Sequence, residues 1–387
     1  MHVVEECSIA VYDVEGVACA CPRQWLYLLG EGGVVYSELQ NRFAGLNPAG
    51  VSAYRAFEAG ASLEDLRTIP DADHFTSTSG EELQTVYKLS QGTFPDEDAS
   101  PEWPTLNLSS CGDPANVTIE IDGNPISLRY PPGRLARLCL DYFRGCPITN
   151  RQPRCYLSAQ QTGNGWAIYV NDCEFLVLQR KQQLGLGLMH AARSFLNVQG
   201  DYDVAFHAAM AAQEDRGILL CAARECGKST LAAHLVAQGF DLLTDEPALL
   251  DLDTWSVKSL SVPISLKQGS WPVLQRQWPD LASAPVHIRS DGTKIRLAHP
   301  SKERCSSRAR RLTQIVFPHY CPGSKARVES MSPFQTLRCL IDGGMLLHRR
   351  VARDGFEKFL RLISLTPAYE IHYPSLQEAD RMLREAI

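Results

Sequence analysis

One stretch decides the fold: Gly217-Ile218-Leu219-Leu220-Cys221-Ala222-Ala223-Arg224-Glu225-Cys226-Gly227-Lys228-Ser229-Thr230. Its first five residues form an apolar run suited to a buried parallel strand. Leu231 and Leu235 then recur at the spacing of a buried helix, and Gly239 marks the helix end. Because a further strand is predicted over residues 241–244, the pattern indicates a strand–loop–helix–strand unit of an α/β domain.

The loop between this strand and helix has the composition of a phosphate-binding loop. Backbone N–H groups of such a loop and of the helix N-terminus point at one centre and bind phosphate oxygens. Lys228 would neutralise the β- and γ-phosphates, and the Ser229 hydroxyl would hold Mg²⁺. Ala222 stands where the P-loop pattern has a glycine. The loop predicts a nucleotide site made of Ala222, Ala223, Arg224, Glu225, Cys226, Gly227, Lys228, Ser229 and Thr230.

Two acidic residues, Asp245 and Glu246, follow the strand at residues 241–244. Ligands of open α/β folds lie at the carboxyl ends of strands, which places these side chains beside the phosphates. A carboxylate there either coordinates Mg²⁺ or accepts the proton of a substrate hydroxyl. The alternative is that the pair only forms a strand-end turn. His207 would by default be a core histidine, but its position just before the P-loop strand makes it a candidate catalytic residue.

Length and composition are those of an ordinary folded protein with more than one compact unit. The chain has 387 residues, 44% hydrophobic and 21% charged, which favours two or three units. A net charge of −6 argues against a nucleic-acid partner, whose binding surface would be basic. No apolar run is long enough to predict a membrane span, and no secretory leader follows Met1. The 13 cysteines are scattered, which favours free, mostly buried thiols in a reducing cytoplasm.

Residues 1–75 are predicted to form a small unit of their own. Two apolar segments within residues 25–39 flank a glycine-rich turn and predict a β-hairpin. Asn47-Pro48 predicts the N-cap and first turn of a helix, and Ser62 with Asp65 predicts a second helix start. A hairpin followed by small helices is the outline of an α+β winged-helix module.

The rest of the chain divides into a linker and a larger domain. Residues 76–105 are polar, acidic and interrupted by proline, and we interpret them as a linker. Residues 106–387 are mixed α/β: strands and one helix are predicted within 106–200, followed by the nucleotide-binding core at 201–387. The predicted elements of the first part are strands at 117–121, 166–170 and 175–178 and a helix at 184–195.

The order of these motifs resembles the HPr kinase-related proteins, relatives of the bacterial HPr serine kinase/phosphorylase that occur in clusters making modified peptides. The resemblance spans residues 106–387 and is carried by the P-loop and by residues 206–209, 242–246, 263–271 and 367–371. It implies a P-loop kinase domain with the fold of the HPr kinase C-terminal domain. The implied phosphoryl donor is ATP or GTP, the implied metal is Mg²⁺, and the implied acceptor is a serine-type hydroxyl.

The same resemblance assigns roles to individual residues. Asp245 would be the catalytic base, and His207 would lie near the phosphates together with Lys228. Ser229, Asp245 and Glu246 would hold the metal. HPr kinase has two aspartates where this chain has Asp245-Glu246.

Residues 25–63 resemble the PqqD-like precursor-recognition modules of peptide-modifying enzymes. In that family a leader peptide adds as a strand to the edge of the hairpin sheet. A generic winged helix with another role is the alternative. The chain as a whole then reads as a cytoplasmic kinase for a ribosomally made precursor peptide. Two rival functions stay open, a non-catalytic adaptor for leader peptide and nucleotide, and a kinase of small hydroxyl compounds. The oligomeric state is open too, a homo-oligomer included.

Several further residues are weaker candidates. Cys226 could be reactive, because a helix N-terminus lowers a thiol pKa, or could simply pack beside the helix start. Lys267 is a candidate substrate contact, whereas His319-x-Cys321 is too isolated to build a metal site. A basic run is interpreted as a solvated face, except that Lys294 and Arg296 could bind phosphates or an acidic peptide. The run comprises Arg289, Lys294, Arg296, Lys302, Arg304, Arg308, Arg310 and Arg311.

Overall fold

The structure is a computed structural model that describes residues 16–67, 80–94, 116–163, 165–222, 226–305, 308–348 and 351–385. Two compact units divide these residues. The N-terminal unit is drawn from residues 1–98, 331–339 and 349–368, and the core unit is drawn from residues 99–330, 340–348 and 369–387. The N-terminal unit therefore includes two segments from late in the chain, which the expected unit at residues 1–75 does not contain.

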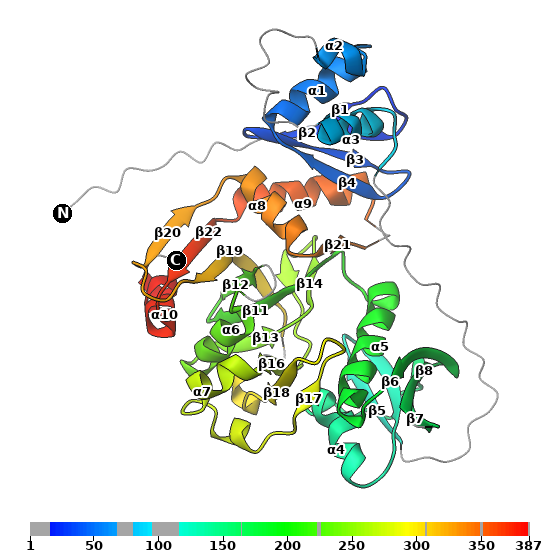
Figure 1. Cartoon of the computed structure of the whole chain (residues 1–387), viewed down its shortest axis with the longest axis vertical. Coiled ribbons are helices and arrows are strands. Elements are labelled where there is room, and N and C mark those ends of the chain that lie inside the picture. The colour runs from blue at the N-terminus through cyan, green and yellow to red at the C-terminus, as the bar shows by residue number, and fades with distance from the viewer. Residues whose placement is uncertain are drawn as a thin grey trace. The chain divides into compact units, whose positions relative to one another are not determined.

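The N-terminal unit has an antiparallel sheet in chain order (Figure 1), made of β1 (Val17–Ala18), β2 (Gln24–Leu29), β3 (Gly32–Ser37) and β4 (Arg42–Leu46). Three helices follow, α1 (Pro48–Glu58), α2 (Leu63–Arg67) and α3 (Gly80–Ser90). Asn47 caps α1 by accepting the Gly50 N–H at 2.7 Å. Ser62 and Asp65 exchange hydrogen bonds at the start of α2. The predicted hairpin and both predicted helix starts are confirmed.

Helix α3 lies where a linker was predicted, so that prediction is wrong for residues 80–94. Leu83, Val86 and Leu89 recur at helical spacing and are buried with Phe57 of α1 and Leu26 of β2 in one apolar cluster. The acidic residues of the first turn suit a helix N-terminus, where they interact favourably with the backbone dipole. Because these first-turn residues are polar, the sequence pattern did not reveal the apolar stripe of α3.

Helix α9 (Arg353–Leu365) covers the other face of the N-terminal sheet. The Phe356 ring stacks on Tyr36 with 4.3 Å between ring centroids, and it contacts Tyr27 edge-on. Arg353 lies over the Trp25 ring. Strand side chains alternate between faces, so Leu26 faces α1 and α3 while Tyr27 faces α9. Both sides of this sheet are therefore buried within the unit.

The core unit begins with a five-stranded sheet packed against two helices. Helix α5 buries one side on this sheet, in a cluster that includes Leu184, Leu188 and Phe195. The strands run in the order β5 (Asn116–Ile121), β6 (Asn124–Arg129), β7 (Cys155–Thr162), β8 (Gly165–Val170) and β9 (Cys173–Leu178), with α4 (Arg134–Leu140) and α5 (Leu184–Gln199). The strands and the helix predicted for this segment are confirmed.

The second sheet of the core unit contains the strand that precedes the predicted phosphate-binding loop. Among the described residues it has ten strands, in the order β13-β11-β12-β19-β15-β14-β10-β21, with β22 on β19 and β20 on β22. They are β10 (Val204–Phe206), β11 (Ala208–Gln213), β12 (Arg216–Cys221), β13 (Asp241–Thr244), β14 (Ala248–Asp251), β15 (Ser256–Val257), β19 (Arg310–Tyr320), β20 (Arg327–Ser330), β21 (Met345–Leu347) and β22 (Ala368–Tyr373). A small sheet adds β16 (Ile264–Lys267), β18 (Lys294–Ala298) and β17 (His287–Ile288).

The predicted strand–helix–strand unit is present as β12, α6 (Lys228–Ala237) and β13, with one difference. Strand β11 lies between β12 and β13 and is antiparallel to both. Strands β12 and β13 therefore run parallel without being neighbours, and the parallel partner of β12 is β19. The remaining α-helices of the described residues are α7 (Trp271–Leu274) and α10 (Leu376–Glu385) in the core unit, and α8 (Pro333–Asp342), most of which belongs to the N-terminal unit.

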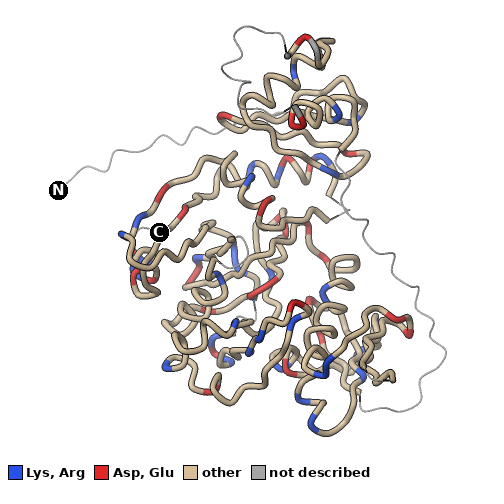
Figure 2. Tube along the Cα trace, in the orientation of Figure 1, with Lys and Arg blue, Asp and Glu red and all other residues tan. Residues whose placement is uncertain are grey.

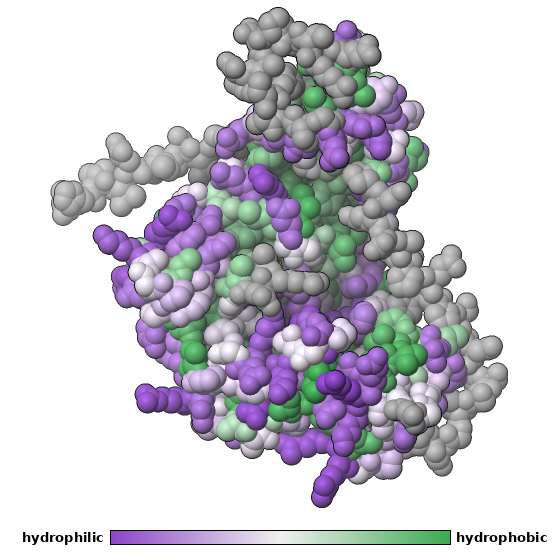
Figure 3. All heavy atoms as spheres, in the orientation of Figure 1, coloured by the Kyte–Doolittle hydropathy of each residue, from purple (hydrophilic) through white to green (hydrophobic). Residues whose placement is uncertain are grey.

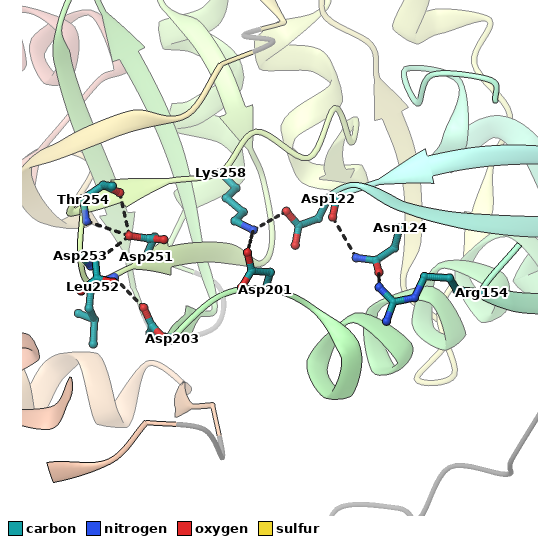
Figure 4. A network of polar contacts seen from close by, with 10 residues as sticks. All are labelled: Asp122, Asn124, Arg154, Asp201, Asp203, Asp251, Leu252, Asp253, Thr254 and Lys258. Carbon is teal, nitrogen blue, oxygen red and sulfur yellow. Dashed lines mark hydrogen bonds and ion pairs between the residues drawn. The ribbon is translucent and has the colours of Figure 1, made fainter. Parts of the chain in front are cut away.

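A polar network fastens the five-stranded sheet to the rest of the core unit (Figure 4). Lys258 Nζ lies 2.8 Å from Asp122 Oδ1 in the turn between β5 and β6. Asp203 Oδ2 accepts the Leu252 N–H at 2.8 Å, which joins the start of β10 to the end of β14. Burial raises the pKa of Asp122, and the Lys258 ammonium opposes that shift. The Lys258–Asp122 contact therefore ties the turn between β5 and β6 to the segment that follows β15.

The distribution of surface charge and the burial of the cysteines do not single out a functional site. Acidic and basic residues are interspersed along the chain (Figure 2), and hydrophilic residues predominate on the face in Figure 3. Only four of the eleven described cysteines are buried, so the expectation of mostly buried thiols is wrong. Across the described ranges, no helix combines the length and apolar character that a membrane crossing needs.

Candidate active site

The turn at the start of α6, where the phosphate-binding loop is predicted, is built around Gly227. This residue is the N-cap of α6 with φ 87°, a left-handed conformation that favours glycine. A Cβ added there would lie 3.3 Å from the Tyr373 hydroxyl, so the loop also lacks room for a side chain. Ala223, Arg224 and Glu225 lie outside the described residues. Ala222 is buried at the end of β12, whereas Cys226 is partly exposed.

Lys228 is the first residue of α6 and is only 8% exposed. Its ammonium donates a hydrogen bond to the His207 carbonyl at 2.6 Å. Because His207 is the residue between β10 and β11, this bond holds the Lys228 side chain at the junction of the two strands. Burial lowers the pKa of Lys228, while the carboxylates of Glu246 and Asp245 oppose that shift. A partly desolvated ammonium at a helix N-terminus is suited to a multiply charged anion.

Asp245 directly follows β13 and is 4% exposed. Its Oδ2 accepts the Ser265 N–H at 2.8 Å, and its Oδ1 is buried without a hydrogen-bond partner among the described residues. Burial raises the pKa of Asp245, and the Ser265 amide and the Lys228 ammonium oppose this. The site therefore contains a buried carboxylate oxygen with no satisfied hydrogen bond, close to the Ser229 side chain, which acts to lower the pKa of Asp245.

Glu246 is held by two basic side chains. His207 Nδ1 lies 2.8 Å from Glu246 Oε1, and Arg193 Nη1 lies 3.4 Å from the same oxygen. Arg193 Nη2 also donates to the Glu246 carbonyl at 2.6 Å. Burial alone would raise the pKa of Glu246, but the His207 hydrogen bond and the Arg193 charge outweigh it and lower the pKa to about 2.

Sequence reasoning did not identify Arg193. It lies on α5, 53 positions before Glu246, inside a helix whose pattern indicates only packing. One signal was available, since Arg193 is a charged residue within a stretch that is otherwise largely apolar. His207, Lys228, Asp245 and Glu246, all predicted, do come together in one place.

The residues present fit Mg²⁺. This ion prefers oxygen ligands and commonly takes one or two from protein and the rest from phosphates and water. The unpartnered Asp245 Oδ1 and the Ser229 hydroxyl supply such oxygens, and Ser229 lies close enough to Asp245 to lower its pKa. Glu246 already binds His207 and Arg193, which makes it the less available of the predicted metal ligands.

Most of the remaining candidates have structural partners. Arg296 lies over the Trp271 ring at 4.3 Å, and Arg304 donates to the Gly239 carbonyl at the end of α6. Thr230 shares a hydrogen bond of 2.6 Å with Ser270. Lys294 is exposed at the start of β18 and Lys267 ends β16. Six of the eight residues of the basic run are exposed, which agrees with the interpretation of a solvated face.

His319 and Cys321 are less isolated than their sequence spacing indicates. His319 and His372 stack with 4.9 Å between ring centroids, and both approach Glu370 Oε1. Cys321 Sγ lies 3.7 Å from His372 Nδ1. Even so, the part of the chain that is described holds no group of three such side chains arranged to bind a metal ion.

No family model matches the chain, and no curated protein matches it significantly in sequence. The resemblance to HPr kinase-related and PqqD-like proteins therefore rests on the motifs alone, and the roles it implies are proposals.

Proposed function

We propose that this protein is an ATP-dependent kinase of the HPr kinase type, which transfers the γ-phosphoryl group to a serine-type hydroxyl of a ribosomally made precursor peptide. The N-terminal unit would bind the leader of that peptide, and the reaction would take place in the cytoplasm. One observation carries most weight. A buried carboxylate with a free oxygen, that of Asp245, shares its site with a buried lysine at the start of a P-loop helix.

Each residue has a role in the proposed reaction. Lys228 and the amides at the start of α6 bind the phosphates and stabilise the charge of the transferring group. Asp245 accepts the proton of the acceptor hydroxyl, and its raised pKa makes it a stronger base than an exposed carboxylate. Glu246 orients His207, whose carbonyl fixes the Lys228 ammonium. Mg²⁺, held by Ser229 and Asp245, would neutralise charge on the phosphates.

The test uses the precursor peptide encoded nearest the gene, with Mg²⁺ and ATP, and mass spectrometry as the readout. Asp245→Asn should lose phosphoryl transfer and still bind ATP. An adaptor would bind peptide and nucleotide, form no phosphopeptide, and behave the same in wild type and variant.

The leader hypothesis needs a separate comparison. Removing the N-terminal sheet would leave Phe356 and the other buried side chains of α9 without the residues that cover them, so truncation would disturb the fold as well as peptide binding. The peptide should be varied instead, with and without its leader. Equal turnover of both forms would favour a kinase of small hydroxyl compounds.

A further inference from the structure

A pocket of about 520 Å³ opens beside the carboxylate end of the candidate site, within the core unit. Such a volume falls in the range of sites that enclose a small molecule or a short peptide segment. Four segments of the chain build it: one side of α5, the end of β10, the turn after β13, and the turn that leads into β21. The lining side chains on which the inference rests are Arg193, Asn197, Phe206, His207, Glu246 and Leu346.

His207 connects this pocket to the nucleotide site. Its ring lines the pocket and bonds Glu246 through Nδ1 at 2.8 Å, while its backbone carbonyl accepts the Lys228 ammonium at 2.6 Å. Gly344, with φ 92°, packs closely on the same residue: a Cβ at Gly344 would lie 3.3 Å from the His207 Cβ. A group bound in the pocket would therefore lie directly beside the residues that position the phosphates.

The chemistry of the lining favours an uncharged ligand. Arg193 and Glu246 are paired with each other, so their charges offset one another, and the exposed carboxylate of Asp342 in the same lining disfavours an acidic ligand. Phe206 and Leu346 provide apolar wall, and Leu346 is 52% exposed although its neighbours in β21 are more covered. Asn197, exposed on α5, adds an amide that both donates and accepts hydrogen bonds.

We propose that this pocket binds the acceptor: an uncharged peptide segment whose serine-type hydroxyl passes His207 and Glu246 toward the proposed base Asp245, the residue before Glu246, with Asn197 and Leu346 setting which flanking residues fit. The inference rests on the proposed kinase function and adds the place and the chemistry of the acceptor. It also assigns α5, which lies outside the nucleotide-binding strands, a direct part in substrate selection.

The test fills the pocket from its exposed rim. Leu346→Trp and Asn197→Trp both change exposed side chains, so they should leave the fold intact, and Val177→Trp is a matched control because Val177 is 61% exposed on β9, outside the pocket. The probes are capped pentapeptide pools with a central serine and uncharged flanks, a pool with a central alanine, a pool with glutamate flanks, and free L-serine. Binding is followed by saturation-transfer NMR, and phosphorylation by mass spectrometry.

The proposal predicts that wild type and Val177→Trp bind the neutral serine pool in preference to the other three probes. Both pocket variants should lose that binding at least tenfold while all proteins bind Mg²⁺-ATP equally. Four results would overturn it: unchanged binding in the pocket variants, no preference for serine or for neutral flanks, stronger binding of free L-serine, or no binding to wild type at millimolar peptide. If wild type fails to bind Mg²⁺-ATP, the kinase proposal falls, and the NMR comparison still decides the pocket.

Discussion

Replacing Asp245 with asparagine should make the protein more stable and less active at the same time. The native carboxylate is buried, and one of its oxygens has no hydrogen-bond partner among the described residues. Folding therefore removes a charge from water with incomplete compensation, which is why the pKa of Asp245 is raised. Asparagine has nearly the same shape, keeps an oxygen for the Ser265 N–H, and carries no charge.

The size of the effect follows from linkage. Each tenfold change in a protonation equilibrium corresponds to about 1.4 kcal/mol. The loss of attraction to Lys228 offsets part of the gain, so we expect Asp245→Asn to stabilise the fold by about 1–2 kcal/mol above neutral pH. A raised pKa means that the folded protein binds a proton more tightly than the unfolded chain. As the pH falls, wild type therefore gains stability relative to Asp245→Asn. The gain should therefore shrink toward pH 4.

Chemical denaturation at pH 8 and at pH 4.5 measures both quantities, and Asp280→Asn is the control because Asp280 is exposed in the same unit. Phosphoryl transfer by Asp245→Asn should fall by a factor of about 10²–10⁴, the usual contribution of a general base. A stability change that is unfavourable, or equal at both pH values, would refute the reasoning about burial. Retained turnover would refute the assignment of the base.

Three further substitutions test other parts of the structure. Glu246→Gln should lower the free energy of unfolding by about 2 kcal/mol at pH 7, after allowance for partial exposure of the side chain. Wild type loses this advantage as the pH falls from about 4.5 to about 2, so stability curves of the two proteins that stay parallel over this range would contradict the prediction. Gly227→Ala should cost about 1–2 kcal/mol and weaken ATP binding in calorimetry, because φ is 87° there, whereas Gly269→Ala, with open space around it, should do neither. Phe356→Ala should cost about 3–5 kcal/mol in denaturant unfolding of the N-terminal unit, and a loss below 1 kcal/mol would mean that α9 does not complete its core.

Local signals predicted the local parts of the structure well. The glycine and proline punctuation around residues 25–50 and the cap at Asn47 specify a hairpin and a helix start through neighbouring residues alone. The P-loop strand and its helix are equally local, because an apolar run, a left-handed glycine and a helical stripe follow one another directly. These interactions act over a few positions, which is why the sequence pattern predicts them.

Long-range pairing could not be predicted in the same way. Strand β11 inserts between β12 and β13. Helix α9 packs on a sheet more than 300 positions earlier in the chain, because the aromatic face of that sheet must be buried. Arg193 reaches Glu246 from α5 for a similar reason: a partly buried carboxylate is stabilised by a charged partner, and any helix that passes close enough can supply it. Composition gave no sign of which helix that would be.

The central claim is phosphoryl transfer from a nucleotide held by Lys228. The most direct measurement is mass spectrometry of the precursor peptide encoded nearest the gene, after incubation with the full-length protein, Mg²⁺ and ATP. We predict the gain of one phosphate on a serine-type hydroxyl with wild type, and its absence with Lys228→Ala. An unmodified peptide, under conditions in which the protein demonstrably binds both peptide and ATP, would contradict the kinase account and favour an adaptor.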